Sequence, residues 1–329
     1  MPKASVIITT HNRPKLLPRA IESARASGHD VEIVVVDDAS VDETAEICRS
    51  IDGIKYVRLD RNQGVAGARN VGLIASCGEY ISFLDDDDVR LKDSLDQQIK
   101  ILDQPPGAMM IYAQAIPEDT DGMRRHPFPD EFPQGDIFWQ LLIKNFIPSG
   151  SVVFRRSCIS QIGLLDDTVP GIDDWDLWIR IAEIFPVAVM ETPVLIWRQS
   201  TLNSGQGSSA TLDLIECGRR KLRQDWLRLP RAASAPSEKR NMVWSGFSKN
   251  IAEHLAWESF ASARNAQFIR ASRAVGTLLQ LHPSALAQLA RRWSSASTIA
   301  TLVSVLIHPD ELPNARAHFK ELRSNTSRQ

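Results

Sequence analysis

Short apolar runs alternate with amphipathic stretches over the first ninety residues, and this alternation restricts the chain to very few folds. The runs occupy residues 6–8, 31–36, 54–59 and 80–84. The run 31–36 is near-continuous, which is typical of a strand buried in a parallel sheet. The repeated strand–helix–strand order predicts an α/β fold, with an open, mostly parallel sheet flanked by helices.

The rest of the chain divides into an irregular segment and a helical one. Between residues 111 and 197 the alternation of strand and helix patterns is less regular, and after residue 212 no strand pattern is present. We therefore expect an α/β domain over residues 1–211 and an α-helical region over residues 212–329. The local patterns predict helices at 13–26, 41–50, 66–77 and 174–184, further strands at 149–154 and 187–190, a loop at 117–133 and a helix break at 230–236.

Charge is distributed unevenly along the chain, although the formal net charge is only −2. Residues 1–213 hold 20 lysines and arginines against 32 aspartates and glutamates, whereas residues 214–329 hold 18 against 8. The basic helices, with clusters at 219–223 and 291–293, are expected to pack on the acidic domain, to form a homodimer, or to lie on an anionic membrane surface. The basic residues match no nucleic-acid-binding motif, so no nucleic-acid partner is expected.

Cysteine spacing and hydropathy limit the setting of the protein. The four cysteines, at positions 48, 77, 158 and 217, form no CxxC pair, so neither a disulfide scaffold nor a zinc ribbon is expected. No stretch approaches the ~20 apolar residues that span a bilayer, and no signal-peptide pattern opens the sequence. The prediction is a cytoplasmic protein, at most peripheral on the inner face of the cell membrane.

Aspartates gather where predicted strands end. Asp37 and Asp38 follow the second strand, and Asp85 to Asp88 follow the fourth. Ligands of open α/β sheets bind beyond the carboxyl ends of strands. Four consecutive aspartates repel one another unless a cation lies among them, and Mg²⁺ or Mn²⁺ shared with substrate phosphates is the simplest partner. The alternatives are acidic turns, in which Asp88 caps the next helix and Ser40 and Glu43 form a capping box.

Two further motifs carry charged residues. Asp173 and Asp174 open a helix that contains Trp175 and Trp178, and tryptophans at this spacing are more often core than sugar platforms. An aspartate there is alternatively a simple helix cap. The segment 64–70 lacks the Lys-Ser/Thr of a P-loop, which leaves Arg69 as a cation that offsets nearby acids or contacts a nucleotide.

The order of these motifs resembles that of the inverting family 2 glycosyltransferases, whose nucleotide-sugar-binding domain has the Rossmann-like GT-A fold. The resemblance covers residues 4–205 and leaves the helical remainder outside. His11 stands where tyrosine is usual, and Asp173 stands where glutamate is usual. The matching motifs are residues 5–13, 36–40, 62–70, 83–88 (the DxD element) and 173–178.

The resemblance implies a metal-dependent hexosyltransferase of polysaccharide or glycoconjugate synthesis. It would move a sugar from a nucleotide-diphosphate sugar, with uracil the expected base and thymine or guanine left open, to a hydroxyl of a glycan or lipid-linked acceptor. Direct displacement inverts the anomeric carbon, so no protein nucleophile is needed. By position, the resemblance assigns donor binding to Thr9, Asn12, Asp38, Arg69, Asp85 and Asp86, Mn²⁺ or Mg²⁺ binding to Asp87, and the general base to Asp174, with a pKa raised by burial behind Trp175 or Trp178.

Two other functions remain open from the sequence. A nucleotidyltransferase of similar fold would need a glycine-rich loop with arginine directly after the first strand, where Thr9 to Asn12 stand instead. A catalytically inactive module that binds nucleotide sugars or glycans is the second alternative. Residues 198–209, rich in glycine and serine, are expected to form either a loop that closes over the donor or a linker.

Overall fold

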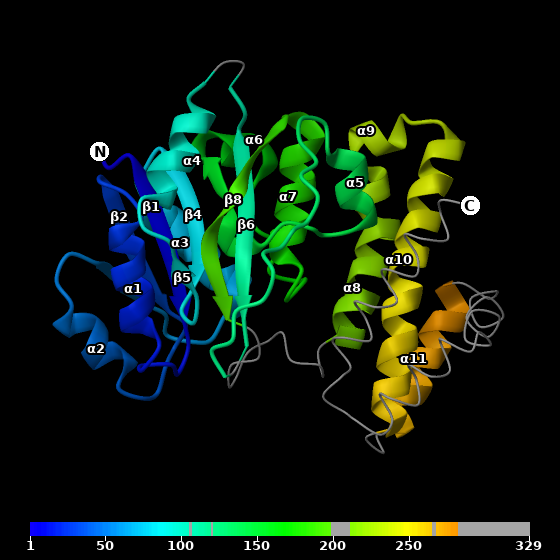
Figure 1. Ribbon diagram of the computed structural model, residues 1–329, viewed down its shortest axis with the longest axis horizontal. Coiled ribbons are helices and arrows are strands. Elements are labelled where there is room, and N and C mark those ends of the chain that lie inside the picture. Colours follow the sequence, from blue (N-terminus) through cyan, green and yellow to red (C-terminus); the bar gives the residue numbers. More distant parts are fainter. Residues whose placement is uncertain (105–106, 120, 199–210, 265–267, 282–329) are drawn as a thin grey trace. The chain divides into compact units, whose positions relative to one another are not determined.

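The computed structural model describes residues 1–104, 107–119, 121–198, 211–264 and 268–281 (Figure 1). The chain forms two compact units, residues 1–243 and residues 244–329. The assignment of a catalytic domain to residues 1–211 and of a helical region to 212–329 stays a prediction. The expected loop at 198–209, apart from Arg198, and the basic cluster at 291–293 lie outside the described residues.

An eight-stranded sheet forms the centre of the first unit, in the order β3-β2-β1-β4-β7-β6-β8-β5. The expected α/β fold with a helical C-terminal region is confirmed, and the sheet is mixed because β7 runs antiparallel to β4 and β6, and β5 runs antiparallel to β8. The strands are β1 (Ala4–Thr10), β2 (Val31–Asp37), β3 (Lys55–Arg58), β4 (Tyr80–Asp85), β5 (Val89–Arg90), β6 (Met110–Glu118), β7 (Val153–Arg155) and β8 (Val187–Arg198).

Helices of the first unit cover both faces of this sheet (Figure 1). In chain order the helices are α1 (Leu17–Ala26), α2 (Thr44–Ser50), α3 (Gly64–Ala75), α4 (Ser94–Leu102), α5 (Phe138–Ile143), the 3-10 turns η1 (Ser149–Ser151) and η2 (Arg156–Cys158), α6 (Ile159–Ile162), α7 (Asp173–Ile184), α8 (Thr211–Gln224), η3 (Trp226–Arg228) and α9 (Pro230–Ala233). Helix α10 (Ser237–Arg264) begins in the first unit and continues into the second, which also holds α11 (Phe268–Leu281).

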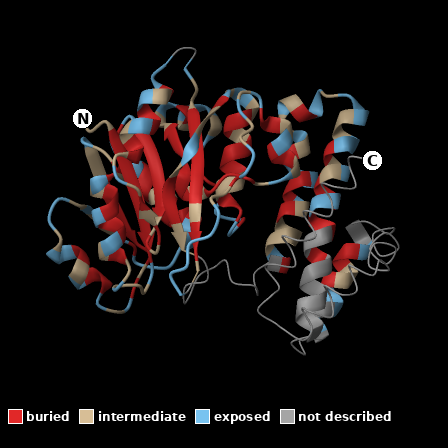
Figure 2. Ribbon diagram, in the orientation of Figure 1, coloured by how far each residue is buried: buried red, intermediate tan, exposed pale blue. Residues whose placement is uncertain are grey.

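Alternate residues of β1 show how the two faces are filled. Ile8 packs with Leu17 of α1 and Leu95 of α4 in one buried cluster. Ile7 points to the opposite face, where a Cβ added at Gly72 of α3 would collide with it, so this close approach requires glycine. Strands β1, β2, β4 and β6 are buried along most of their length (Figure 2). Helix α7 shares the face of α3, because Trp178 packs on Phe83.

The carboxyl ends of six strands lie at one edge of the sheet. Strands β1, β2, β3 and β4 are parallel to one another. Strand β6 shares their direction because β7 is antiparallel to both β4 and β6, and β8 is parallel to β6. The aspartates expected from the sequence to bind a ligand follow β2 and β4 at this edge. The fold therefore brings together motifs that lie far apart in the sequence.

The helix-cap alternatives for Ser40 with Glu43 and for Asp88 are wrong. Helix α2 begins at Thr44, and the Ser40 hydroxyl accepts the backbone N–H of Asn12 instead of capping a helix. Strand β5 follows Asp88 directly, and the Asp88 carboxylate accepts the backbone N–H of Arg198 at 2.9 Å. In both cases the side chain that the local sequence pattern assigns to a helix cap instead accepts a hydrogen bond from a residue distant in sequence.

Three boundaries also differ from the predictions. The segment expected as a strand at 149–154 begins with η1, and only its end joins β7. Strand β6 extends to Glu118, into the expected loop, and β8 extends from 187 to Arg198, because the two strands pair along their length. Among the residues that the structure describes, no helix is both long enough and apolar enough to span a bilayer.

Candidate active site

The loop after β2 is fixed by its two aspartates. Asp37 is fully buried, and its carboxylate accepts the backbone N–H of Ser40 at 2.8 Å and the hydroxyl of Tyr56 at 2.7 Å. Asp38 instead accepts the backbone N–H groups of Gln63 at 2.7 Å and Gly64 at 2.9 Å, where α3 begins. A carboxylate at a helix N-terminus is stabilised by the helix dipole. Asp37 is therefore structural, whereas Asp38 lies at the strand edge.

The loop after β1 lies against the loop after β2. Asn12 has a positive φ of 54°, and its side-chain oxygen accepts the backbone N–H of Val41 at 2.9 Å. One ring nitrogen of His11 lies 2.7 Å from the carbonyl oxygen of Asp38. Thr9 pairs with Asp85 in the sheet register. Thr9, Asn12 and Asp38, three of the residues assigned to donor binding, thus share one edge.

Arg13 is the cation among the aspartates that follow β4. Its Nη1 donates to Asp86 at 2.8 Å and to Asp87 at 3.1 Å, and the Thr10 hydroxyl donates to Asp86 at 2.6 Å. Burial raises the pKa of Asp86 to about 6, although Arg13 and Thr10 favour its charged form. No role for Arg13 was expected from the sequence. Its position in the matching motif 5–13, directly after Asn12, was the sequence signal that could have indicated a role for it.

Arg69 joins the end of β4 to the start of α7. Its Nη2 donates to Asp85 at 2.9 Å and its Nη1 donates to Asp173 at 3.0 Å, and only 5% of its side chain is exposed. The guanidinium also lies 5.1 Å from the centre of the Phe83 ring. In this geometry Arg69 offsets two carboxylates, one of the two roles expected for it. Its contact with a nucleotide stays a prediction.

Asp174 lies in the first turn of α7, next to the Asp173 partner of Arg69. Its carboxylate accepts the backbone N–H of Trp175 at 2.6 Å. Burial and the nearby Asp173 carboxylate raise the pKa of Asp174 to about 7, while Arg69 opposes the shift. A carboxyl group with this pKa exchanges its proton near neutral pH, as a general base must.

The tryptophans of α7 have separate places. Trp178 is fully buried and packs between Phe83 and Phe154, with ring centroids 6.4 and 5.9 Å away, as expected for a core residue. The Trp175 indole donates to the carbonyl oxygen of Leu141 at 2.8 Å. Trp178 therefore packs α7 on the sheet and Trp175 joins α7 to α5, while the first turn of α7 carries the acidic groups.

Across the described ranges, no group of three or more His, Cys, Asp and Glu side chains is placed to hold a metal ion. Mg²⁺ often binds through one or two carboxylates together with substrate phosphates. Asp87 and the neighbouring aspartates therefore fit a cation only if a phosphate-bearing ligand supplies further oxygens. The edge combines carboxylates, two arginines and a carboxyl group with a pKa near neutrality.

Comparison with known proteins identifies similar sequences and folds. The model of the family described as "Glycosyl transferase family 2" matches residues 5–162. An uncharacterized glycosyltransferase of Rickettsia felis is 28% identical over 77% of this chain and 39% of its own length. A GalNAc(5)-diNAcBac-PP-undecaprenol beta-1,3-glucosyltransferase of Campylobacter jejuni is 44% identical over 29% of this chain and 33% of its own length. The chain thus spans two fifths or less of these relatives.

Solved structures show the same fold at low sequence identity. The crystal structure of S. aureus TarS 1-349 in complex with UDP-GlcNAc is 17% identical, with a TM-score of 0.60, and the match covers 98% of this chain and 92% of that one. The full S. aureus TarS structure gives a TM-score of 0.55 over 96% of this chain and 53% of that one, at 18% identity. These similarities confirm the GT-A-like architecture.

Proposed function

Because the domain over residues 5–162 belongs to glycosyl transferase family 2, we propose that this chain transfers a sugar from a nucleotide-diphosphate sugar to an acceptor hydroxyl in glycoconjugate synthesis. The observation that carries this proposal is the position of Asp174, which Arg69 and Asp173 connect to the aspartate-rich end of β4. A proton acceptor thus stands beside the edge where ligands of open α/β sheets bind.

Asp174 acts as the general base in this proposal. Its carboxylate takes the proton of the acceptor hydroxyl as the hydroxyl oxygen attacks the anomeric carbon and the bond to the nucleoside diphosphate breaks. The attack comes from the face opposite the leaving group, so the anomeric configuration inverts. The pKa of about 7 supports this role, because a base is most effective when its pKa is near the working pH.

The donor lies along the ends of β1, β2 and β4 in this proposal, and it is a UDP-sugar. The UDP-GlcNAc complex of the similarly folded TarS supports this choice. Asp38 accepts the imide N–H of the base, since each carboxylate oxygen has two lone pairs and its bonds to Gln63 and Gly64 use only part of that capacity. Thr9, Asn12, Asp85 and Asp86 line the same edge and contact the nucleoside.

A divalent cation joins the donor in this proposal, with Asp87 as its protein ligand. A bound Mn²⁺ or Mg²⁺ would supply positive charge to the leaving diphosphate. Because no three-residue acidic group stands ready in the described part of the chain, cation binding requires the donor phosphates. Arg13 holds the Asp86 and Asp87 carboxylates in place with a fixed positive charge.

The acceptor is a glycan or a lipid-linked saccharide. The printed name of the C. jejuni relative, which includes an undecaprenol-linked saccharide, supports this class. The basic helices are proposed to bring the chain to an anionic membrane surface, which is where a lipid-linked acceptor is found.

Product analysis separates the three functions. The protein is incubated with a panel of nucleotide sugars, Mn²⁺ and candidate acceptors, and the nucleotide product and the anomeric configuration of the new linkage are determined. Glycosyl transfer releases a nucleoside diphosphate and gives an inverted anomer. Release of inorganic pyrophosphate from a nucleoside triphosphate would show a nucleotidyltransferase instead. Donor binding with no product under any condition would show a binding module.

A further inference from the structure

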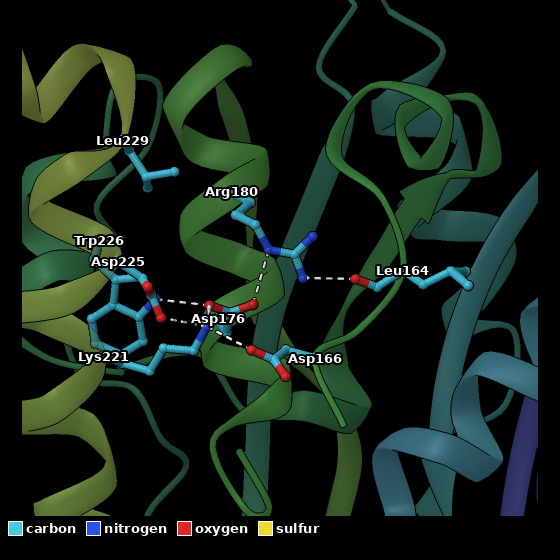
Figure 3. Close-up of a pocket in the computed structure, with 8 residues that line it drawn as sticks. All are labelled: Leu164, Asp166, Asp176, Arg180, Lys221, Asp225, Trp226 and Leu229. Atoms are coloured by element: carbon cyan, nitrogen blue, oxygen red, sulfur yellow. Dashed lines mark hydrogen bonds and ion pairs between the residues drawn. The ribbon is translucent and has the colours of Figure 1, made fainter. Parts of the chain in front are cut away.

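Helix α8 and the 3-10 turn η3 contact the base-bearing helix through one buried carboxylate. Asp176 lies two residues after Asp174 in the first turn of α7, and it is buried (Figure 3). One oxygen of Asp176 accepts the indole N–H of Trp226 at 2.8 Å and lies 3.3 Å from Lys221 Nζ. The other oxygen accepts Arg180 Nε at 2.9 Å. All three partners lie outside the family match, which ends at residue 162.

Lys221 of α8 joins helix α7 to the loop that precedes α7. Its ammonium lies 2.7 Å from Asp166, 3.0 Å from Asp225 and 3.3 Å from Asp176, with 10% of the side chain exposed (Figure 3). One cation thus offsets three carboxylates, from the loop before α7, from α7 itself and from the end of α8. Removal of that cation leaves like charges close together.

Trp226 contacts the first turn of α7 at a second point. Its ring centroid lies 4.9 Å from that of Trp175, the residue next to Asp174, and the Trp226 side chain is buried. Trp226 therefore touches both residues that directly follow the base. Among the described residues, Trp226 alone donates an indole N–H to Asp176.

A cavity of about 270 Å³ borders this network, lined among others by Leu164, Asp166, Arg180 and Leu229 (Figure 3). The volume exceeds that of a single water molecule. Besides the packing of Trp226 on Trp175, the directional bonds from Trp226 and Lys221 to Asp176 connect the first turn of α7 to α8 and η3.

We propose that Trp226 and Lys221 are positioning residues that hold the first turn of α7, and with it Asp174, in the orientation needed for proton transfer. This inference rests on the proposed function, in which Asp174 is the base. It gives α8 and η3 a part in catalysis, although neither contributes a group to the donor edge. A shift of about 1 Å in a reacting group lowers a rate by up to roughly a hundredfold, so such support is expected to matter.

The test compares Trp226→Phe with wild type and with Trp139→Phe as the matched control. Trp226→Phe keeps a ring against Trp175 and removes the N–H that binds Asp176. Trp139 loses an indole in the same way, but its ring contacts Phe138, Arg231 and Lys239. Turnover is expressed per UDP-binding site, measured by calorimetry, so that unfolded molecules do not count.

We expect Trp226→Phe to lower turnover per UDP site by roughly tenfold or more, with UDP affinity unchanged and Trp139→Phe like wild type. The acidic limb of the pH profile should move to lower pH, because a looser first turn admits water to Asp174. The charged groups that face Asp174, namely Asp173, Asp85 and Arg69, are the same in both proteins. Wild-type turnover per site with an unshifted profile would overturn the proposal.

Lys221→Met provides an independent variant. It keeps the aliphatic stem and removes the charge, and we expect the same loss of turnover per UDP site, with recovery in Lys221→Arg. If Lys221→Arg and Lys221→Met both retain wild-type turnover per site, the positioning role of Lys221 is refuted. The proposed function is tested separately: it fails if the wild-type protein releases no nucleoside diphosphate with any donor and acceptor.

Discussion

Asp174→Asn is expected to stabilise the folded protein at alkaline pH, because the folded structure penalises the charged form of this carboxyl group. The pKa of Asp174 is about 7 in the fold, against an ordinary value of 3.8. A group whose pKa is raised by folding binds more protons in the native state, so its contribution to stability is lost as the pH rises from about 4 to about 7. Asparagine has nearly the same shape and cannot ionise, so the variant avoids this loss.

The size of the effect follows from the shift. One pKa unit corresponds to about 1.36 kcal/mol, so the full penalty is at most about 4 kcal/mol above pH 7. Between pH 5 and pH 8 the free energy of unfolding of the variant should therefore gain roughly 2 to 3 kcal/mol on that of wild type. Other titrating groups are common to both proteins and cancel in the difference.

The assay is urea denaturation of both proteins at several pH values, without nucleotide. Asp167→Asn is the matched control, because Asp167 is exposed in the loop before α7 and its replacement removes the same kind of side-chain carboxylate outside the site. A difference between Asp174→Asn and wild type that stays constant from pH 5 to pH 8 would refute the reasoning. It would mean that the Asp174 carboxylate is not disfavoured by its surroundings.

Three other variants test separate parts of the structure. Arg69→Met leaves Asp85, Asp173 and Asp174 without their shared cation, so the free energy of unfolding should fall by about 3 kcal/mol or more. The acidic limb of the pH–activity profile should move to higher pH, because Arg69 holds the pKa of Asp174 down. An unchanged urea midpoint and an unchanged pH profile would contradict this. Asp87→Asn should remove the Mn²⁺ dependence of UDP binding measured by calorimetry, and wild type should bind Mn²⁺ only weakly without UDP; equal Mn²⁺ dependence in both proteins would exclude Asp87 as the ligand. Gly72→Ala should lower the thermal midpoint, since its Cβ collides with Ile7 in the packed face between α3 and β1, and a midpoint equal to that of wild type would show that the two elements can separate at no cost.

Much of the fold could be predicted from the sequence, because local pattern determines it. The run 31–36 is almost continuously apolar and forms β2, buried on both faces, and the helix predicted from residue 174 begins at Asp173. The local sequence pattern failed to predict the hydrogen-bond partner of a side chain that could bond either a nearby helix end or a distant residue. Ser40 bonds Asn12 and Asp88 bonds Arg198, and neither partner is visible from the residues nearby.

The candidate site was predictable in part for the same reason. Motif position identified the residues at the edge, but not how they pair. Arg69 was expected near the nucleotide, and it joins Asp85 to Asp173, which is 104 residues away in sequence. Arg13 received no role, because its two carboxylate partners lie 73 and 74 residues further along the chain, beyond three intervening strands.

The asymmetry of charge is explained in part by one residue. Lys221 belongs to the basic cluster of the back half, and it pairs with Asp166 and Asp176 of the acidic front half. Packing on the acidic domain is one of the roles expected for the basic helices, and Lys221 has that role. Membrane contact and dimer formation by the other basic residues stay predictions.

The proposed function depends most directly on Asp174. The decisive measurement is nucleoside diphosphate release by wild type, Asp174→Asn and Asp167→Asn with a transferable donor, alongside UDP affinity for each protein. The account predicts that Asp174→Asn loses transfer by at least roughly a hundredfold while its UDP affinity and the activity of Asp167→Asn stay at wild-type values. Near-normal transfer by Asp174→Asn would contradict it.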